Sequence, residues 1–268
     1  MLRDLEKKYA AYVSTFADAQ GHLPEMMELK RVHTRFVVEN ASLIADGEKF
    51  DPYTREAALA AALLHDTGRY EQLKRYNTFR DSDSVDHAVF SHDIVRDLGW
   101  LDGLCDDETR EAVLKAVLYH NRREVPDGPD GLLKACSHTV RDADKLDIFR
   151  VAEDRIANTD WRKDSTAFWN LRADAPPDRE VVDCILNSKP VAYQMIKSLS
   201  DFILIQVGWM ISGLYYETSR RLCRERGHLA MRRDFLRTLS DDPSVARVCD
   251  FAEKVLYGSD GARGEFSK

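Results

Sequence analysis

The stretch DPYTREAALAAALLHDTGR, residues 51–69, decides the fold of this chain. Asp51 can accept hydrogen bonds from the free backbone N–H groups at a helix start, and Pro52 suits the first helical position. The alanines and leucines that follow favour a helix, and a run this apolar predicts that the helix is buried on most of its surface. The stretch therefore places a buried helix in the first quarter of the chain.

This helix is expected to end on polar side chains, His65 and Asp66, with Gly68 stopping it. Neighbouring residues on a helix point about 100° apart, yet both side chains can reach an ion placed beyond the helix end. A buried imidazole or carboxylate is costly unless a partner satisfies it, and a divalent cation does so well.

Helical periodicity continues on both sides of this stretch, and no alternating strand pattern appears. We therefore expect an all-α protein. The polar residues 70–86 are interpreted as an ordered loop over a site, and residues 158–178 as a long excursion. The expected helices are 2–19, 24–45, 52–66, 85–98, 106–120 and 132–157, followed by further helices toward the C-terminus.

Composition excludes several classes of protein. A hydrophobic fraction of 44% and a charged fraction of 32% are ordinary for a globular protein, and the net charge of −7 argues against general binding of nucleic acid or anionic membranes. The apolar residues 202–216 are fewer than the roughly 20 needed to cross a bilayer, so they predict a buried helix.

The cysteines and the first residues indicate a cytoplasmic protein. The five cysteines form no Cys-x-x-Cys pair, which favours reduced thiols over a zinc cluster or a disulfide framework. The opening residues MLRDLEKKYAAYV carry charges throughout and lack the apolar core of a signal peptide.

Further histidines and acids stand at informative places. His33 lies on a largely apolar face of its expected helix, and Asp144 lies within the helical run RDADKLDIF. His87 begins an expected helix and His120 ends one. Side chains of this kind in helical surroundings suit metal binding.

The order H…HD…D, with HDTGR at 65–69 and DADKLD at 142–147, resembles the HD superfamily of metal-dependent phosphohydrolases over roughly residues 31–150. The resemblance implies an HD-domain helical bundle with additional C-terminal helices. We expect one all-helical domain over residues 1–257, with its HD core at about 25–157 and a mobile tail at 258–268.

The resemblance also implies the ligands of the metal. A first ion would be held by His33, His65, Asp66 and Asp144, whereas His87 in DHAVFSH and His120 in YHN are similar to the extra histidines of members with two ions. One or two divalent ions per chain are expected. Imidazole and carboxylate ligands suit Mn, Fe, Mg, Ni or Zn without choosing among them.

Nearby residues compete for these places. Asp142 and Asp147 share the expected helix with Asp144, and the family pattern selects Asp144. His92 lies five residues after His87, about 140° around the helix, so only one of them readily faces a site. We assign that place to His87. His138 is interpreted as an ordinary helix residue because it points about 120° away from Asp144.

Catalytic roles follow from the resemblance. Asp66 is the expected bridging ligand, and His120 binds the second ion or protonates the leaving oxygen. Arg69 and Lys145 flank the metal motifs and are candidates for contacts with a substrate phosphate, with structural salt bridges as their alternative role. Lys145 and Arg69 could also neutralise charge that grows on the phosphoryl group.

The expected function is hydrolysis of a phosphate ester or anhydride, in a nucleotide or a related small metabolite, by metal-activated water. The run NRREVPDG after His120 disfavours cyclic-di-GMP as the substrate, because it departs from the pattern of those phosphodiesterases. Two alternatives stay open, a di-iron HD-type oxygenase and a non-catalytic nucleotide-binding sensor. A homodimer through the apolar residues 203–214 is a further alternative to their burial in the core.

Overall fold

The structure is a computed structural model that describes residues 1–126, 130–160, 171–173 and 175–258. Within these residues the regular structure is helical, apart from one isolated bridge between Arg172 and Ser198, and no β-strand occurs in them. The all-α prediction is confirmed. The predicted tail from 259 onward, and residues 161–170 of the predicted excursion, lie outside the described part of the chain.

The chain divides into two compact units, Met1–Asp147 and Ile148–Lys268. Helix α7, Gly131–Asn158, contributes residues to both units. The single domain expected from the sequence stays a prediction.

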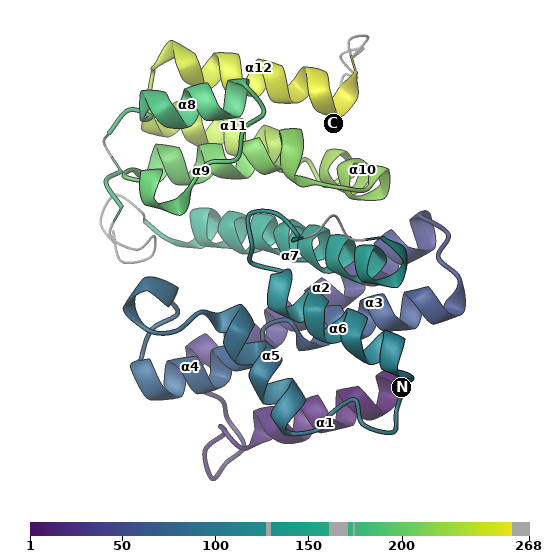
Figure 1. The fold of residues 1–268 in the computed structure, drawn as a ribbon. Coiled ribbons are helices and arrows are strands. Elements are labelled where there is room, and N and C mark those ends of the chain that lie inside the picture. The colour runs from purple at the N-terminus through teal and green to yellow at the C-terminus, as the bar shows by residue number, and fades with distance from the viewer. Residues whose placement is uncertain (127–129, 161–170, 174, 259–268) are drawn as a thin grey trace. The chain divides into compact units, whose positions relative to one another are not determined.

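The first unit is a helical bundle, coloured purple to teal in Figure 1. Helix α3 contacts α1, α2 and α6, and α5 contacts both α4 and α6. The helices of this unit before α7 are α1 (Leu2–Ser14), α2 (Glu25–Gly47), α3 (Pro52–Leu64), α4 (Gly68–Tyr76), α5 (His87–Asp97) and α6 (Asp107–Tyr119), with a short 3₁₀ helix, η1, at Asp81–Asp83.

The start of α3 is as the sequence predicts. The carboxylate of Asp51 accepts hydrogen bonds from the backbone N–H groups of Tyr53 and Thr54, at 2.9 and 3.1 Å. Every side chain from Ala57 to Leu64 is buried. Five of these eight residues are alanines, so neighbouring helices can approach α3 closely. His65 directly follows the last residue of α3.

Gly68 does not stop a helix, contrary to the sequence prediction. It begins α4, and α4 runs through residues that were predicted to be a loop, so the loop is confined to residues 77–86. The reason is packing between α4 and α5. The Gly68 N–H donates to Ser91 Oγ at 2.9 Å, and a Cβ on Gly68 would lie 2.6 Å from the backbone nitrogen of Ser91.

The second unit is also helical. Helix α9 contacts α8, α11 and α12, and its side chains are buried from Leu199 to Val207 except at Phe202. A π-helical turn, η4, continues it at Trp209–Gly213, so the apolar run 202–216 is helical and mostly buried as far as Ile211, whereas residues 214–216 lie beyond the helix. The other elements are α8 (Arg179–Leu186), the 3₁₀ turn η3 (Tyr193–Met195), α9 (Leu199–Gly208), α10 (Glu217–Glu225), α11 (His228–Leu239) and α12 (Pro243–Tyr257).

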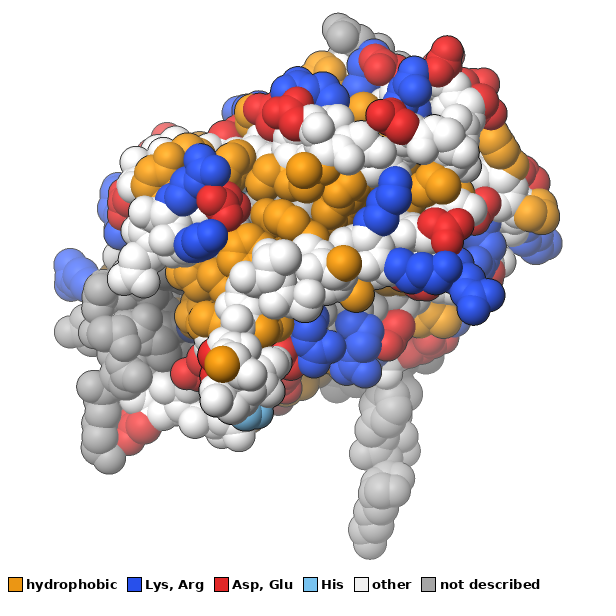
Figure 2. Space-filling model, turned by 90° about the horizontal axis from the view of Figure 1, so that it is seen from below, with side chains coloured by type: hydrophobic (Ala, Val, Ile, Leu, Met, Phe, Trp, Pro, Cys, Tyr) orange, Lys and Arg blue, Asp and Glu red, His pale blue; other side chains and the backbone are white. Residues whose placement is uncertain are grey.

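The surface mixes apolar and charged side chains. Figure 2 shows apolar side chains gathered in the middle of the face turned to the viewer, with basic and acidic side chains around them. Among the described residues no helix is both long enough and apolar enough to span a membrane. The homodimer stays a prediction.

Candidate metal centre

The carboxylate of Asp66 lies between two pairs of imidazoles in the first unit. Its Oδ2 is 3.6 Å from His33 Nε2 and 3.5 Å from His65 Nε2. Its Oδ1 is 3.7 Å from His87 Nε2 and 3.8 Å from His120 Nε2. All five side chains are buried. One carboxylate therefore presents each of its oxygens to a different pair of histidines.

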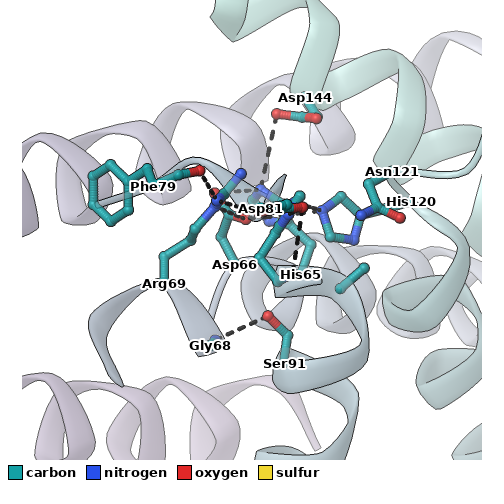
Figure 3. Close-up of polar contacts among 12 residues, drawn as sticks. His65, Asp66, Gly68, Arg69, Phe79, Asp81, Ser91, His120, Asn121 and Asp144 are labelled. Atoms are coloured by element: carbon teal, nitrogen blue, oxygen red, sulfur yellow. Dashed lines mark hydrogen bonds and ion pairs between the residues drawn. The ribbon is translucent and has the colours of Figure 1, made fainter. Parts of the chain in front are cut away.

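The first cluster is His33, His65 and Asp144, whose ligand atoms all lie within 4.8 Å of one another. The two Nε2 atoms are 3.3 Å apart. Asp144 Oδ1 is 3.1 Å from His33 Nε2 and 3.9 Å from His65 Nε2. Figure 3 shows Asp144 reaching down to the centre from α7, opposite the side chains of His65 and Asp66.

The second cluster is Asp66, His87 and His120, again with all ligand atoms within 4.8 Å of one another. The Nε2 atoms of the two histidines are 3.1 Å apart. His87 is the first residue of α5, and His120 directly follows the last residue of α6. The two helix ends that carry the histidines thus meet at Asp66.

Each of the four imidazoles has an acceptor at Nδ1. The Nδ1 of His65 is 2.7 Å from the carbonyl of Ala62, and that of His120 is 2.7 Å from the carbonyl of Val117. A carbonyl accepts only, so both rings carry their proton on Nδ1 and expose a lone pair at Nε2. The other two rings use carboxylates, since His33 Nδ1 is 2.6 Å from Asp147 and His87 Nδ1 is 2.5 Å from Asp81.

This arrangement fits metal ions. Two Nε2 lone pairs 3.1 or 3.3 Å apart cannot satisfy each other, because neither atom has a hydrogen to donate when both rings are neutral. A cation held between them satisfies both. Acceptors at the outer nitrogen are the usual partners of metal-binding histidines, which they orient and make more basic.

The protonation states suit ligands. Burial, then the neighbouring His87, holds the pKa of His120 well below its ordinary value, and burial also lowers the pKa of His65. Burial by itself raises the pKa of Asp66, but the cations around it, Lys30 first, hold that pKa well below its ordinary value. At neutral pH His65 and His120 therefore offer neutral imidazoles, and Asp66 offers an ionised carboxylate between them.

His33 differs from the other histidines. Burial and Lys30 lower its pKa, but hydrogen bonds with Asp144 and Asp147 outweigh them and leave the pKa raised. Burial also raises the pKa of Asp144, while the bond with His33 lowers it, and the pKa ends below its ordinary value. In the absence of a cation, a protonated His33 can thus join these two carboxylates.

Three residues near the centre were missed as site residues by the sequence analysis. Lys30 Nζ lies 2.7 Å from Asp66 Oδ2, Asp147 accepts from His33, and Asp81 accepts from His87. Helical spacing could have found two of them. Lys30 is three residues before His33, and Asp147 three after Asp144, so each pair shares a helix face. Asp81 lies in an irregular segment without periodicity.

The two predicted phosphate contacts lie beside the centre. Arg69 Nε is 3.5 Å from Asp66 Oδ1, while its NH1 donates to Gln72, to the Phe79 carbonyl and to Asp81 (Figure 3). Arg69 therefore braces the loop that supports His87. Lys145 donates to the carbonyl of Arg141 at 3.2 Å, and burial lowers its pKa to about 8. A phosphate contact by either side chain stays a prediction.

The competing residues lie elsewhere. His92 is half-buried and pairs with Asp93 at 3.0 Å, and neither joins the two clusters among the described residues. Asp142 is buried outside both clusters. Burial lowers the pKa of His138 to about 4, as expected of an ordinary half-buried helix histidine.

The comparisons with known proteins agree with this geometry. The family model of the HD domain matches residues 32–148, a range that contains all six residues of the two clusters. Searches of curated proteins and of solved structures found no match. Residues 32–148 are therefore an HD domain.

Proposed function

We propose that this chain is a phosphohydrolase that uses two divalent ions, one on each side of Asp66, to hydrolyse a phosphate ester or anhydride in a small metabolite such as a nucleotide. HD domains as a family are metal-dependent hydrolases. The observation that carries the two-ion proposal is the division of the Asp66 oxygens between two imidazole pairs.

In this proposal a first ion would be held by His33, His65, Asp144 and Asp66, and a second by His87, His120 and Asp66. Bound there, divalent ions would supply an acidified water as the nucleophile and a positive charge for the phosphoryl oxygens. Nitrogen and oxygen ligands without a thiolate leave Mn, Fe, Mg, Ni and Zn as candidates.

The residues of the chain hold and orient this centre. The acceptors at Nδ1 fix each ring, so that every Nε2 faces inward before an ion arrives. This favours His120 as a ligand over a proton donor, because its Nδ1 proton is committed to the carbonyl of Val117.

Substrate would approach from the side of Lys30 and Asp144. Their side chains are each 18% exposed, against 5% or less for His33, His65 and Asp66. A lysine ammonium at the more open side can attract an anionic phosphate and offset its charge. Lys145, adjacent to Asp144 in the chain, would supply a second cation there on leaving the carbonyl of Arg141, to which its ammonium donates at 3.2 Å.

The test is phosphate release by the full chain, purified without chelators or a metal-affinity tag. It would be assayed with phosphomonoesters, phosphodiesters and nucleoside triphosphates in the presence of each candidate metal. We expect release that Asp66→Asn abolishes and that Asp93→Asn leaves unchanged. Asp93 is a matched control, because it also follows a histidine directly in a His-Asp pair but lies outside both clusters.

The alternatives give different results. Oxygen consumption by the iron-loaded chain, with no phosphate release, would replace the proposal by the di-iron oxygenase. Tight nucleotide binding without turnover, across all the metals, would replace it by the sensor.

A further inference from the structure

Arg141 joins the helix of the first cluster to the segment that carries a ligand of the second. It lies on α7 three residues before Asp144, and only 5% of it is exposed. Its guanidinium points at the end of α6. NH1 donates to the carbonyls of Tyr119 at 2.9 Å, of His120 at 3.2 Å and of Arg122, and NH2 donates to that of Arg123 at 3.0 Å.

The need for such a group follows from the end of the helix. The last carbonyls of an α-helix have no partner within it, and α6 ends at Tyr119. The residues after it form turns and bends, which leave their own carbonyls to be satisfied. A guanidinium provides five donors in a rigid fork, and its positive charge is favourable at a helix C-terminus. One buried side chain thus fixes the backbone path of residues 119–123.

The position of His120 depends on this path. Its ring is oriented by the bond from Nδ1 to the Val117 carbonyl, and its backbone carbonyl is held by Arg141. Together these contacts place Nε2 3.1 Å from His87 Nε2 and 3.8 Å from Asp66 Oδ1. The first cluster has its own supports, since Asp147 holds His33 and the Ala62 carbonyl holds His65.

We infer that Arg141 is a positioning residue for the second ion. By donating hydrogen bonds to the backbone carbonyls after α6 it places His120, and its loss would selectively weaken the binding of the second ion. The inference rests on the proposed two-ion function. It assigns to Arg141 no contact with substrate or ion, only the placement of a ligand.

A purely structural role is the competing explanation, and the second unit supplies a matched control. Arg232 is 1% exposed and also donates to backbone carbonyls, those of His228 and Phe149. It lies outside the HD domain. Arg232→Lys therefore removes a comparable buried guanidinium without touching the segment of His120.

The experiment measures Mn²⁺ binding to the full chain by titration calorimetry, together with the electron paramagnetic resonance spectrum of the loaded protein. The wild type is expected to bind two ions and to give the spectrum of a spin-coupled pair. In Arg141→Lys the second ion should bind about 10-fold or more weakly, the range seen when an outer-shell partner is lost, with the first within about twofold. The loaded variant should give the spectrum of isolated Mn²⁺.

Chemical rescue sharpens the test. Guanidinium added at millimolar concentration to Arg141→Ala should restore the coupled spectrum, because it can re-enter the site of the missing side chain. If Arg141→Ala does not fold, Arg141→Lys carries the test alone, since it keeps the charge and most of the stem. Arg232→Lys should keep both ions and the coupled spectrum.

The possible results separate the two proposals. A wild type that binds one ion would overturn the two-ion function and this inference with it. A wild type with two ions, and an Arg141→Lys variant with two ions of unchanged affinity, would overturn the inference alone. Equal weakening of both ions in Arg141→Lys, matched by Arg232→Lys, would also overturn it, because general destabilisation would then explain the loss.

Discussion

Lys30 Nζ lies 2.7 Å from Asp66 Oδ2, the carboxylate oxygen that faces His33 and His65. A lysine ammonium therefore stands where the carboxylate would meet the first ion, and it is the main cation that holds the pKa of Asp66 low. Lys30 is 18% exposed and could turn toward solvent when an ion binds. The same charge would then compete with the metal and attract the substrate.

This competition predicts the behaviour of Lys30→Met. Without the ammonium, the first ion meets less repulsion near Asp66, so its affinity should rise, by about tenfold if the lost repulsion is worth roughly 1.4 kcal/mol. The KM for an anionic substrate should rise as well, because a cation at the open side is gone. Calorimetry and steady-state kinetics measure the two effects. Lys74→Met is the control, because Lys74 is 63% exposed on α4. Weaker metal binding in Lys30→Met would contradict the competition.

The two carboxylates that accept a hydrogen bond from a histidine Nδ1 should each support the binding of a different ion. Asp147 accepts from His33 in the first cluster, and Asp81 accepts from His87 in the second. Loss of such a partner costs about 10- to 100-fold in metal affinity. Asp147→Asn should therefore weaken mainly the first ion, and Asp81→Asn mainly the second. Each variant controls for the other in the same titration, and equal weakening of both ions by both variants would contradict the assignment.

The six residues of the two clusters could be predicted from the sequence, because the order H…HD…D and the histidines of DHAVFSH and YHN give residue types in a set order along the chain. The groups that hold these side chains in place could be predicted less well. Two of the four Nδ1 acceptors are backbone carbonyls, of Ala62 and Val117, and no residue type reveals them. Asp81 lies beside His87 because hydrogen bonds from Arg69 and Gln72 hold the loop that carries Asp81. That path depends on tertiary contacts.

Helix α4 shows why local patterns also failed. Its sequence GRYEQLKRY is polar, and its buried positions, Gly68, Tyr70 and Gln72, alternate instead of following a helical stripe. Gln72 is fully buried, yet it is satisfied by Asp81, Ser84 and the Val85 carbonyl. Helices whose buried face is polar give no periodic signal.

The lowered pKa of His120 should make the stability of the metal-free chain depend on pH. Burial, followed by His87 and His65, lowers its pKa well below the ordinary 6.5. In the unfolded chain the same imidazole takes up a proton below about pH 6.5, so the unfolded state binds more protons there. The contribution of neutral His120 is therefore fully present above that pH and is lost as the pH falls below it.

Urea unfolding in the presence of a chelator, from about pH 8 to about pH 5, would measure this with His120→Gln as the reference. The free energy of unfolding of the wild type should fall relative to the variant by up to about 1.4 kcal/mol per pH unit. The raised pKa of His33 acts in the opposite direction, but it is present in both proteins and largely cancels. Parallel curves would show that His120 already takes up its proton in the folded state.

Gly68→Ala should separate α4 from α5. The added Cβ would lie 2.6 Å from the backbone nitrogen of Ser91 and 3.0 Å from the backbone carbon of Phe90, and backbone atoms cannot turn away as a side chain can. Overpacking of this kind costs about 1–3 kcal/mol in the free energy of unfolding. The hydrogen bond from the Gly68 N–H to Ser91 Oγ would stretch as well.

Gly68→Ala should affect the two metal clusters to different degrees. Helix α5 begins with His87, whereas the first cluster takes its ligands from α2, α7 and the end of α3, so Gly68→Ala should weaken the second ion more than the first. Ser91→Ala in the same chain should not restore the affinity, because the closest atom belongs to the backbone. Gly208→Ala is the matched control, since its added Cβ would meet only the Ile185 side chain, at 3.1 Å. Recovery of stability and of the second ion in the Gly68→Ala, Ser91→Ala double variant would place the clash at the Ser91 hydroxyl instead, and α4 would then need no glycine.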